Sequence, residues 1–353
     1  GVPLRGVVHV GADERVVECA LVIALSGHGR SQLRGVTPCA QLDAALAAWT
    51  ALGGQCVRHG DVLHIAGVGP NGWSAPRGAL DAGDSRYLLA QLTAVLSAQA
   101  FGTRVTMRAG AEPMPVEHTV GALRARGAQV AAKADAAGRL VAPVAVAPLM
   151  AAEQLAPIDA ALPVADAAAK QALLLSGLYG RATTTLSEPH VSFDGLERLL
   201  VALGAPLRRI GSVVALSAED WDGRLPALGD VHMPGSAAVC AHLVAAAQAL
   251  PHSDITLRGA SINPTHSGVL DALRAWGGAV SYQLTGDAAL REPTADVRAR
   301  SARLRGGVVD AELLVRAADT PAAFLVAATA TQRGVRLCEL SARAAFADPQ
   351  CRQ

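Results

Sequence analysis

The chain repeats itself about every 75 residues, and this period constrains its fold more than any other feature. Four runs rich in Ala and Leu each end in a pair of small residues, at Gly53-Gly54, Gly127-Ala128, Gly204-Ala205 and Gly277-Gly278. The second residues of these pairs lie 74, 77 and 73 positions apart. Glycine stops an amphipathic helix because it adopts the left-handed backbone without a Cβ penalty. We therefore expect an amphipathic helix before each pair and a strand after it.

A second helix precedes each amphipathic helix by about half a period. Its copies are rich in Ala, Leu and Val, and they are residues 16–26, 85–99, 167–178, 236–250 and 320–332. Helices that are apolar all round require burial on every side. Short β-branched stretches such as Arg104–Met107 and Asp254–Leu257 separate the helices and favour strands. The repeat therefore predicts several strand–helix–strand–helix–strand units packed around shared helices.

Length and composition bound the fold and exclude several functions. At 353 residues with 51% apolar side chains, the chain exceeds the size at which one core splits, so we expect two lobes. A net charge of +1 and 3% aromatic residues argue against nucleic acid and against an anionic membrane surface. The longest apolar stretch, residues 140–152, contains two prolines and is too short for a membrane span.

The cysteines and the start of the chain indicate the compartment. Six cysteines are scattered without a Cys-x-x-Cys pair, which is typical of buried thiols in a reducing compartment. The first residues contain no apolar leader segment. We expect a cytoplasmic protein with no metal site and no cofactor.

Three motifs resemble those of the EPSP synthase (enolpyruvyl transferase) family, and they follow one another along the chain in the family's order. Residues 262–274, Ile-Asn-Pro-Thr-His-Ser-Gly-Val-Leu-Asp-Ala-Leu-Arg, are similar to the family's L-N-P-T-R-x-G-L-L-D-x-L-R. Residues 80–85 resemble L-x-A-G-N-S, and residues 188–198 resemble E-P-x-x-S-R-D-H-T-E-R. The resemblance implies a two-lobed, inside-out α/β fold of six βαβαββ units, with the active site between the lobes. It also implies carboxyvinyl transfer from phosphoenolpyruvate to 3-phosphoshikimate.

The resemblance also implies the division into lobes. Residues 1–12 with 228–353 form the first lobe, with units four and five, and residues 13–227 form the second lobe, with units one to three. The chain ends about 20 residues after the fifth buried helix, where family members continue, so we expect the sixth unit to be missing. An incomplete lobe exposes apolar helix faces, which predicts a homo-oligomer or a partner that covers them.

The predicted active site lacks much of the family's positive charge. An EPSP synthase holds two polyanions side by side, so the resemblance implies a cleft rich in Lys and Arg. The alignment places Glu14 where the family has a lysine, and Cys19 and Ala90 where it has arginines. The S-S-Q loop for the substrate phosphate reads Asp166-Ala167-Ala168. At about 4 Å and an effective dielectric of about 20, each such contact is worth about 4 kcal/mol before screening. We therefore expect a degenerate active site that does not hold both ordinary ligands.

Candidate roles follow from the residues that remain. The resemblance implies that Asp319, in a shortened D-E-x-P segment, is the proton-transfer base. Glu14 or Glu18 is a candidate second acid or base, because proton removal and hydroxyl loss need two carboxylates in different environments. Arg15 or Arg86 is the candidate clamp for a substrate carboxylate. The predicted substrate-binding residues are Arg15, Asp84, Ser85, Arg86, Asp166, Ser192 and Arg343.

These residues also have structural interpretations. Acidic residues such as Glu14 and Glu18 complement the positive end of a helix dipole without any catalytic role. Asp319, ahead of Thr320-Pro321, is a good helix N-cap. Asp84 with Ser85, and Ser192 with Asp194, are further capping candidates, and Arg86 fits an exposed turn.

The sequence favours an enzyme of specialised metabolism that acts on a shikimate-like or other small polyhydroxylated carboxylate. Its reaction is either carboxyvinyl transfer or elimination of water. Two alternatives stay open. One is a noncatalytic family member that serves as a scaffold, and the other is a true 3-phosphoshikimate 1-carboxyvinyltransferase completed by residues outside this chain.

Overall fold

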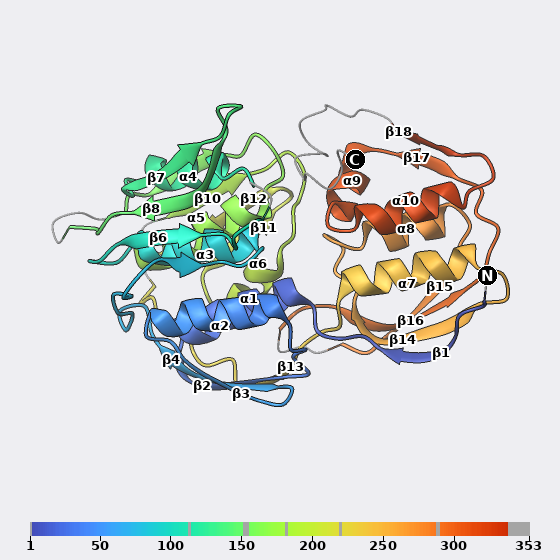
Figure 1. The fold of residues 1–353 in the computed structure, drawn as a ribbon, viewed down its shortest axis with the longest axis horizontal. Helices are drawn as coiled ribbons and strands as arrows, with labels where there is room; N and C mark the ends of the chain where they lie inside the picture. The colour runs from blue at the N-terminus through green and yellow to red at the C-terminus, as the bar shows by residue number, and fades with distance from the viewer. Residues whose placement is uncertain are drawn as a thin grey trace. The chain divides into compact units, whose positions relative to one another are not determined.

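A computed structural model describes residues 2–111, 114–150, 155–180, 183–218, 221–286 and 290–337. These residues form two compact units, each of which has its own sheets and helices (Figure 1). Unit 1 draws its residues from Gly1–Glu14, His190–Asp194 and His232–Gln353, and unit 2 from Arg15–Pro189 and Gly195–Val231.

Unit 2 contains three four-stranded sheets in its described part. The first consists of β13 (Asp230–His232), β2 (His28–Arg34), β4 (Val62–Val68) and β3 (Gln55–His59), in that order. The second consists of β5 (Leu80–Asp81), β6 (Thr103–Thr106), β8 (Leu140–Val146) and β7 (Val130–Ala134). The third consists of β11 (Leu207–Ile210), β12 (Val213–Leu216), β10 (Thr184–Ser187) and β9 (Ile158–Ala161). The second and third sheets share one topology, because each combines a parallel pair, β5 with β6 or β9 with β10, with two antiparallel pairs.

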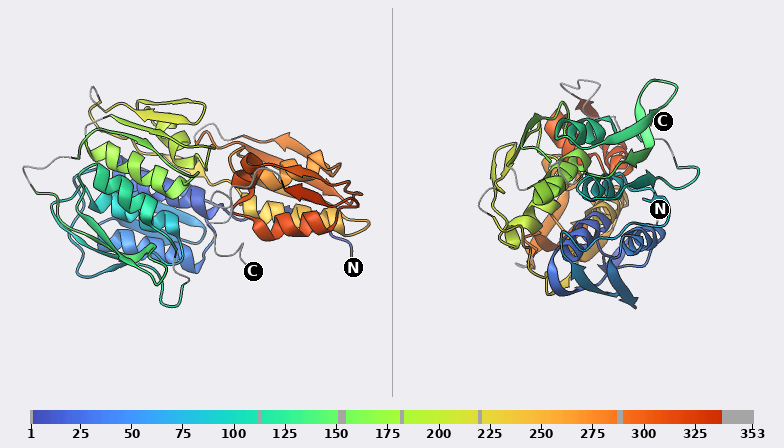
Figure 2. Two further views of the ribbon diagram at one scale, coloured as in Figure 1. Left: turned by 90° about the horizontal axis from the view of Figure 1, so that it is seen from above. Right: turned by 90° about the vertical axis from the view of Figure 1, so that its left-hand side faces the viewer.

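The helices of unit 2 lie inside and its sheets lie outside (Figure 2). The central helices are α1 (Glu14–Ser26), α3 (Arg86–Leu96) and α5 (Ala167–Gly180), which match three of the predicted buried helices. Every residue from Val16 to Ser26 is buried, as is every residue from Leu88 to Leu96. This inside-out arrangement confirms the predicted fold class. None of the helices in the described ranges is long and apolar enough to cross a membrane.

The four repeated pairs of small residues end four helices in the same way. These helices are α2 (Ala40–Ala51), α4 (Glu117–Ala125), α6 (Gly195–Ala202) and α8 (Gly268–Ala275). The first glycine of each pair has a positive φ, of 90° at Gly53 and 92° at Gly277. The N–H of the next residue then donates to a carbonyl five residues earlier, as from Gly54 to Trp49 at 2.9 Å. This is the Schellman motif, and it confirms the predicted helix stops.

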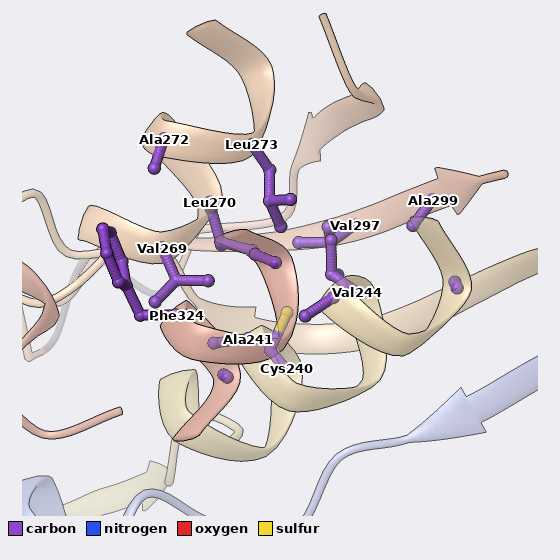
Figure 3. Packing of buried hydrophobic residues seen from close by; sticks show 14 of the residues in the cluster. Cys240, Ala241, Val244, Val269, Leu270, Ala272, Leu273, Val297, Ala299 and Phe324 are labelled. Atoms are coloured by element: carbon purple, nitrogen blue, oxygen red, sulfur yellow. The ribbon is translucent and has the colours of Figure 1, made fainter. Parts of the chain in front are cut away.

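Unit 1 is built on one four-stranded sheet and one two-stranded sheet among its described residues. The larger consists of β1 (Arg5–His9), β14 (Asp254–Ser261), β16 (Thr294–Arg300) and β15 (Ala279–Leu284), and the smaller of β17 (Gly307–Val309) and β18 (Val335–Leu337). Helices α7 (Ala237–Ala249), α8, α9 (Ala311–Ala317) and α10 (Pro321–Thr329) complete the unit. Its core contains Val244, Leu270, Val297 and Phe324 from four of these elements (Figure 3).

Helix α9 was not expected from the repeat. It has seven residues and begins at the N-cap Asp310, whose side chain accepts a hydrogen bond from the Leu313 N–H at 2.8 Å. A Cβ atom on Gly268 would lie 2.7 Å from the Arg316 carbonyl carbon, so the glycine of the 262–274 motif lets α8 approach α9.

An N-cap at Asp319 would start helix α10 at Thr320, but the helix begins one residue later, at Pro321. Its N-cap is Thr320 rather than Asp319, because Pro321 occupies the first helical position and the cap is the residue directly before it. Leu325 and Val326 of α10 and Val239 of α7 are exposed, so the prediction that these two helices are buried on every side is wrong. The homo-oligomer or partner expected to cover this lobe stays a prediction.

Candidate active site

The N-terminal ends of α1, α3 and α5 meet in unit 2, and side-chain contacts join them. The Ser85 Oγ accepts a hydrogen bond from the Leu88 N–H and so caps α3, and it donates to Glu18 Oε2 of α1 at 2.8 Å. Arg86 Nη2 donates to Asp166 Oδ1 at the start of α5, at 2.5 Å. The structure thus brings together four of the predicted site residues. It also shows that Ser85 caps its helix, as the structural interpretation expected.

Glu18 is buried, and besides the bond from Ser85 it accepts a hydrogen bond from Gln41 Nε2 of α2 at 3.0 Å. Gln41 also donates to the Ala82 carbonyl at 3.2 Å and accepts from the Asp84 N–H at 2.9 Å, so it orders the loop before α3. Sequence reasoning missed Gln41, because a glutamine on an amphipathic helix carries no signal of its own.

Asp166 contacts groups from three helices. Its side chain is 9% exposed, and its Oδ1 accepts from the N–H groups of Ala168 at 3.1 Å and Ala169 at 3.2 Å, so it caps α5. His118 Nδ1 of α4 lies 3.0 Å from Asp166 Oδ2. His118 was not predicted, because its distance in sequence from Asp166 hides the contact.

The charges around Asp166 hold it ionised. Burial acts to raise the pKa of Asp166, but the Arg86 guanidinium, the hydrogen bond from His118 and the Ala169 N–H outweigh it, so the pKa lies well below its ordinary value. The same hydrogen bond to Asp166 raises the pKa of His118 above its ordinary value, against a smaller opposing effect of burial. At neutral pH this part of the site therefore contains a permanent negative charge of the protein's own.

Asp84 and Arg15 lie beside this cluster on the same helix ends. Asp84 is exposed and forms an ion pair with Arg108, which sequence reasoning missed. The Arg108 N–H also donates to the Gly83 carbonyl at 2.8 Å, which fixes the cation next to the loop. Arg15 is half-buried in the first turn of α1.

The other predicted site residues belong to unit 1. Glu14 is exposed at the first position of α1, Asp319 is exposed just ahead of α10, and Ser192 is buried in the segment 190–194. Arg343 lies outside the described residues.

Asp13, just ahead of α1, contacts the start of α7. It is buried, and its Oδ2 accepts from the Ala237 N–H at 3.0 Å, while its own N–H donates to the Pro234 carbonyl at 2.8 Å. These two hydrogen bonds connect Asp13 to the segment in which α7 begins.

The motif at residues 262–274 begins in a buried polar network of unit 1. Asn263 Nδ2 donates to Asp194 Oδ1 at 2.8 Å and to Glu292 Oε2 at 3.0 Å. Ser261 Oγ donates to the other oxygen of Glu292 at 2.7 Å and lies 2.9 Å from His266 Nε2. All five side chains are buried. The motif therefore holds the segment 190–194 on unit 1.

The cluster in unit 2 contains carboxylates as well as guanidiniums. Arg86 contacts Asp166 and Arg108 contacts Asp84, so each of these two guanidiniums faces a carboxylate of the protein. Glu18 adds a further carboxylate, which accepts from Ser85 and Gln41. Helix N-terminal ends favour an anion through their dipoles, and at α5 Asp166 is that anion.

Comparisons with known proteins agree with one another. A family model described as EPSP synthase (3-phosphoshikimate 1-carboxyvinyltransferase) matches residues 1–339. A 3-phosphoshikimate 1-carboxyvinyltransferase of Desulforudis audaxviator is 32% identical over 327 residues, which is 92% of this chain and 73% of that protein. Another, of Alkalilimnicola ehrlichii, is 33% identical over 332 residues, 94% of this chain and 72% of that protein. The solved structure of EPSP synthase from Acinetobacter baumannii has a TM-score of 0.80 at 27% identity, and the match covers 97% of this chain and 76% of that one.

Proposed function

The chain belongs to the EPSP synthase family, and on that premise we propose that it acts on a shikimate-like or other small polyhydroxylated carboxylate with fewer phosphates than the family's usual reactants. The reaction is elimination of water from this substrate, or carboxyvinyl transfer to one of its hydroxyl groups from phosphoenolpyruvate, with release of inorganic phosphate. The observation that carries the proposal is the engagement of Arg86 and His118 by Asp166.

Asp166 stands where the family's S-S-Q loop receives the substrate phosphate. A phosphate at this place would face an ionised carboxylate and an arginine that is already paired. At about 4 Å and an effective dielectric of about 20, each pair of like charges costs about 4 kcal/mol before screening. A hydroxyl group, in contrast, donates a hydrogen bond to a carboxylate oxygen at no such cost. The contacts around Asp166 therefore support a substrate that presents hydroxyl groups here.

The remaining roles are part of the same proposal. Arg15, with its cation in the first turn of α1, is the clamp for the substrate carboxylate. Asp319 removes the proton, and Glu14, which like Asp319 is exposed, is the second acid or base. Glu18 acts as a positioning residue, because its hydrogen bonds with Ser85 and Gln41 hold both side chains in place.

Isothermal titration with shikimate, shikimate 3-phosphate and phosphoenolpyruvate tests the proposal. We expect heat with shikimate and none with shikimate 3-phosphate. Heat with phosphoenolpyruvate in the presence of shikimate selects carboxyvinyl transfer, and its absence selects elimination of water. Asp166→Ser restores the family's residue and releases Arg86, so it should raise affinity for shikimate 3-phosphate by about tenfold or more, or about 1.4 kcal/mol. The matched control is Asp230→Ser, which breaks the exposed pair of Asp230 with Arg34 and should change no affinity.

Two outcomes would overturn the proposal. Micromolar binding of both phosphorylated ligands by the unmodified protein, with turnover to the enol ether, would make it an ordinary 3-phosphoshikimate 1-carboxyvinyltransferase. No heat with any of the three ligands, in a protein that is folded by circular dichroism, would favour a noncatalytic scaffold.

A further inference from the structure

A cavity of about 630 Å³ opens at one end of the large sheet of unit 1, away from every residue assigned a role above. Its lining comes from the first residues of β1, β14 and β15, the last residue of β16 and the turns beside them (Figure 1). In the register of the sheet, Arg5 of β1 lies opposite Asp254 of β14, and Asp254 lies opposite Arg300 of β16. The three side chains therefore form one row on the same face of the sheet.

This row contains more positive than negative charge. Asp254 is bound by Arg298, which donates from Nε at 2.9 Å and from Nη2 at 2.7 Å. Arg5 donates to the His252 carbonyl at 3.2 Å, and the part of the chain that the structure describes places no carboxylate within ion-pair distance of Arg5 or Arg300. The hydrogen bond from Arg298 lowers the pKa of Asp254, and the nearby charges of Arg300 and Arg5 lower it further. Arg298 therefore pairs with Asp254, and Arg5 and Arg300 on the neighbouring strands add two further positive charges.

Two serine hydroxyl groups also belong to residues that line the cavity. Ser253 Oγ accepts from the Leu4 N–H at 2.9 Å, and Ser301 Oγ accepts from the His252 N–H at 3.0 Å. A hydroxyl that accepts from the backbone still has its proton to donate. Ser253 is buried, so its orientation is set by the surrounding chain.

The backbone beside these hydroxyls is held in an unfavourable conformation. His252 has a φ of 63°, a left-handed conformation that a residue with a Cβ rarely adopts. Its carbonyl is bound by Arg5 and its N–H by Ser301. Such local strain is maintained where the surroundings fix it, and it is found at ligand-binding sites. Here the strained residue contacts Arg5 and Ser301, two of the residues that line the cavity.

We propose that this cavity binds a small phosphate-bearing anion, at a second site independent of the proposed reaction. A phosphate group offers several acceptor oxygens and about two negative charges, which match two guanidiniums and two hydroxyl donors. The volume is sufficient for a phosphate monoester of a small metabolite. A carboxylate would satisfy one guanidinium and leave the second uncompensated.

Binding of inorganic phosphate and of glycerol 1-phosphate, measured by calorimetry, tests the proposal, with glycerol as the uncharged comparison. Arg5→Gln and Arg300→Gln should each weaken phosphate binding by about tenfold, and the double variant should show no measurable binding. The matched control is Arg258→Gln, on the same sheet, whose cation is paired with Asp296. It should change affinity by less than about twofold.

A second measurement locates the ligand. Phosphate should shift the ring resonances of His252 in the NMR spectrum of the unmodified protein, and glycerol should not. Because Arg5 and Arg300 are exposed, their substitution leaves the folded state intact, which thermal unfolding checks. Unchanged binding in the double variant, an equal loss in Arg258→Gln, or no binding of either phosphate by the unmodified protein would each overturn the proposal. Binding of inorganic phosphate without the ester would restrict the site to the free ion and contradict the proposed ligand class.

Discussion

Replacing Asp166 with Asn removes the negative charge on which Arg86 and His118 converge. Asn keeps the size of the side chain and one oxygen that accepts from the N–H groups at the start of α5, so the helix cap survives. The variant therefore isolates the contribution of the charge from that of the cap.

The expected loss follows from burial. Breaking a fully buried ion pair costs about 3–5 kcal/mol, whereas an exposed pair contributes about 0–1 kcal/mol. The Asp166 side chain is 9% exposed, but those of Arg86 and His118 are 39% and 30% exposed, so the pair lies between these limits. We expect Asp166→Asn to lower the free energy of unfolding by about 2 kcal/mol. Asp166→Ala should cost about 1 kcal/mol more, because it also removes the cap.

Urea unfolding at neutral pH, followed by circular dichroism, measures these values. Asp230→Asn, which breaks an exposed pair with Arg34, is the control and should cost about 0–1 kcal/mol. Because the pKa of Asp166 is depressed in the folded protein, its stabilisation is present above the unfolded pKa of about 3.9 and disappears as the pH falls through the folded pKa. The difference between Asp166→Asn and the unmodified protein should therefore close in acid. Equal losses in Asp166→Asn and Asp230→Asn at neutral pH would refute this reasoning.

Three further predictions test other parts of unit 2. The pKa of His118 is raised in the folded protein, so His118→Gln should lower the free energy of unfolding most below about pH 6.5. This loss should fade as the pH rises through the folded pKa of His118. A pH-independent difference in unfolding free energy would contradict the prediction. Lys170→Met removes the buried ammonium group that pairs with Glu188 and Glu197, so it should cost about 3–5 kcal/mol in urea unfolding. An unchanged midpoint would show that these buried charges are not coupled. Gly177→Ala inserts a Cβ against Thr184 Oγ1 and should cost about 1–3 kcal/mol. Gly121→Ala, where the Cβ meets open space inside α4, should instead gain up to about 1 kcal/mol, and equal effects of the two alanines on the thermal midpoint would exclude a steric cause.

Much of the fold could be predicted because its signals are short-range. A left-handed glycine and a hydrogen bond to a carbonyl five residues earlier need only one turn of helix, so four helix ends could be located from pairs such as Gly53-Gly54. Helix α9 was not predicted, because its seven residues lack such a glycine stop and are too few to show a helical periodicity.

The candidate site could be predicted only in part, because its partners are far apart in sequence. Ser85 was recognised as a capping residue, since a cap depends on the next three residues alone. Its second partner, Glu18, lies 67 residues away, and Arg86 and Asp166 are separated by 80 residues. Gln41 and His118 belong to no motif, so neither could have been identified before the helix ends were brought together.

The sequence by itself determined the repeat, four helix ends, three of the five predicted buried helices and the membership of the family, because each depends on residue types within one or two turns or on an ordered set of motifs. Only the tertiary structure decided that Asp166 neutralises Arg86 and His118, and that Arg5 and Arg300 enclose one cavity with two serine hydroxyls. Electrostatic interaction falls with distance in space, and a chain whose partners lie tens to hundreds of residues apart does not specify that distance until it folds.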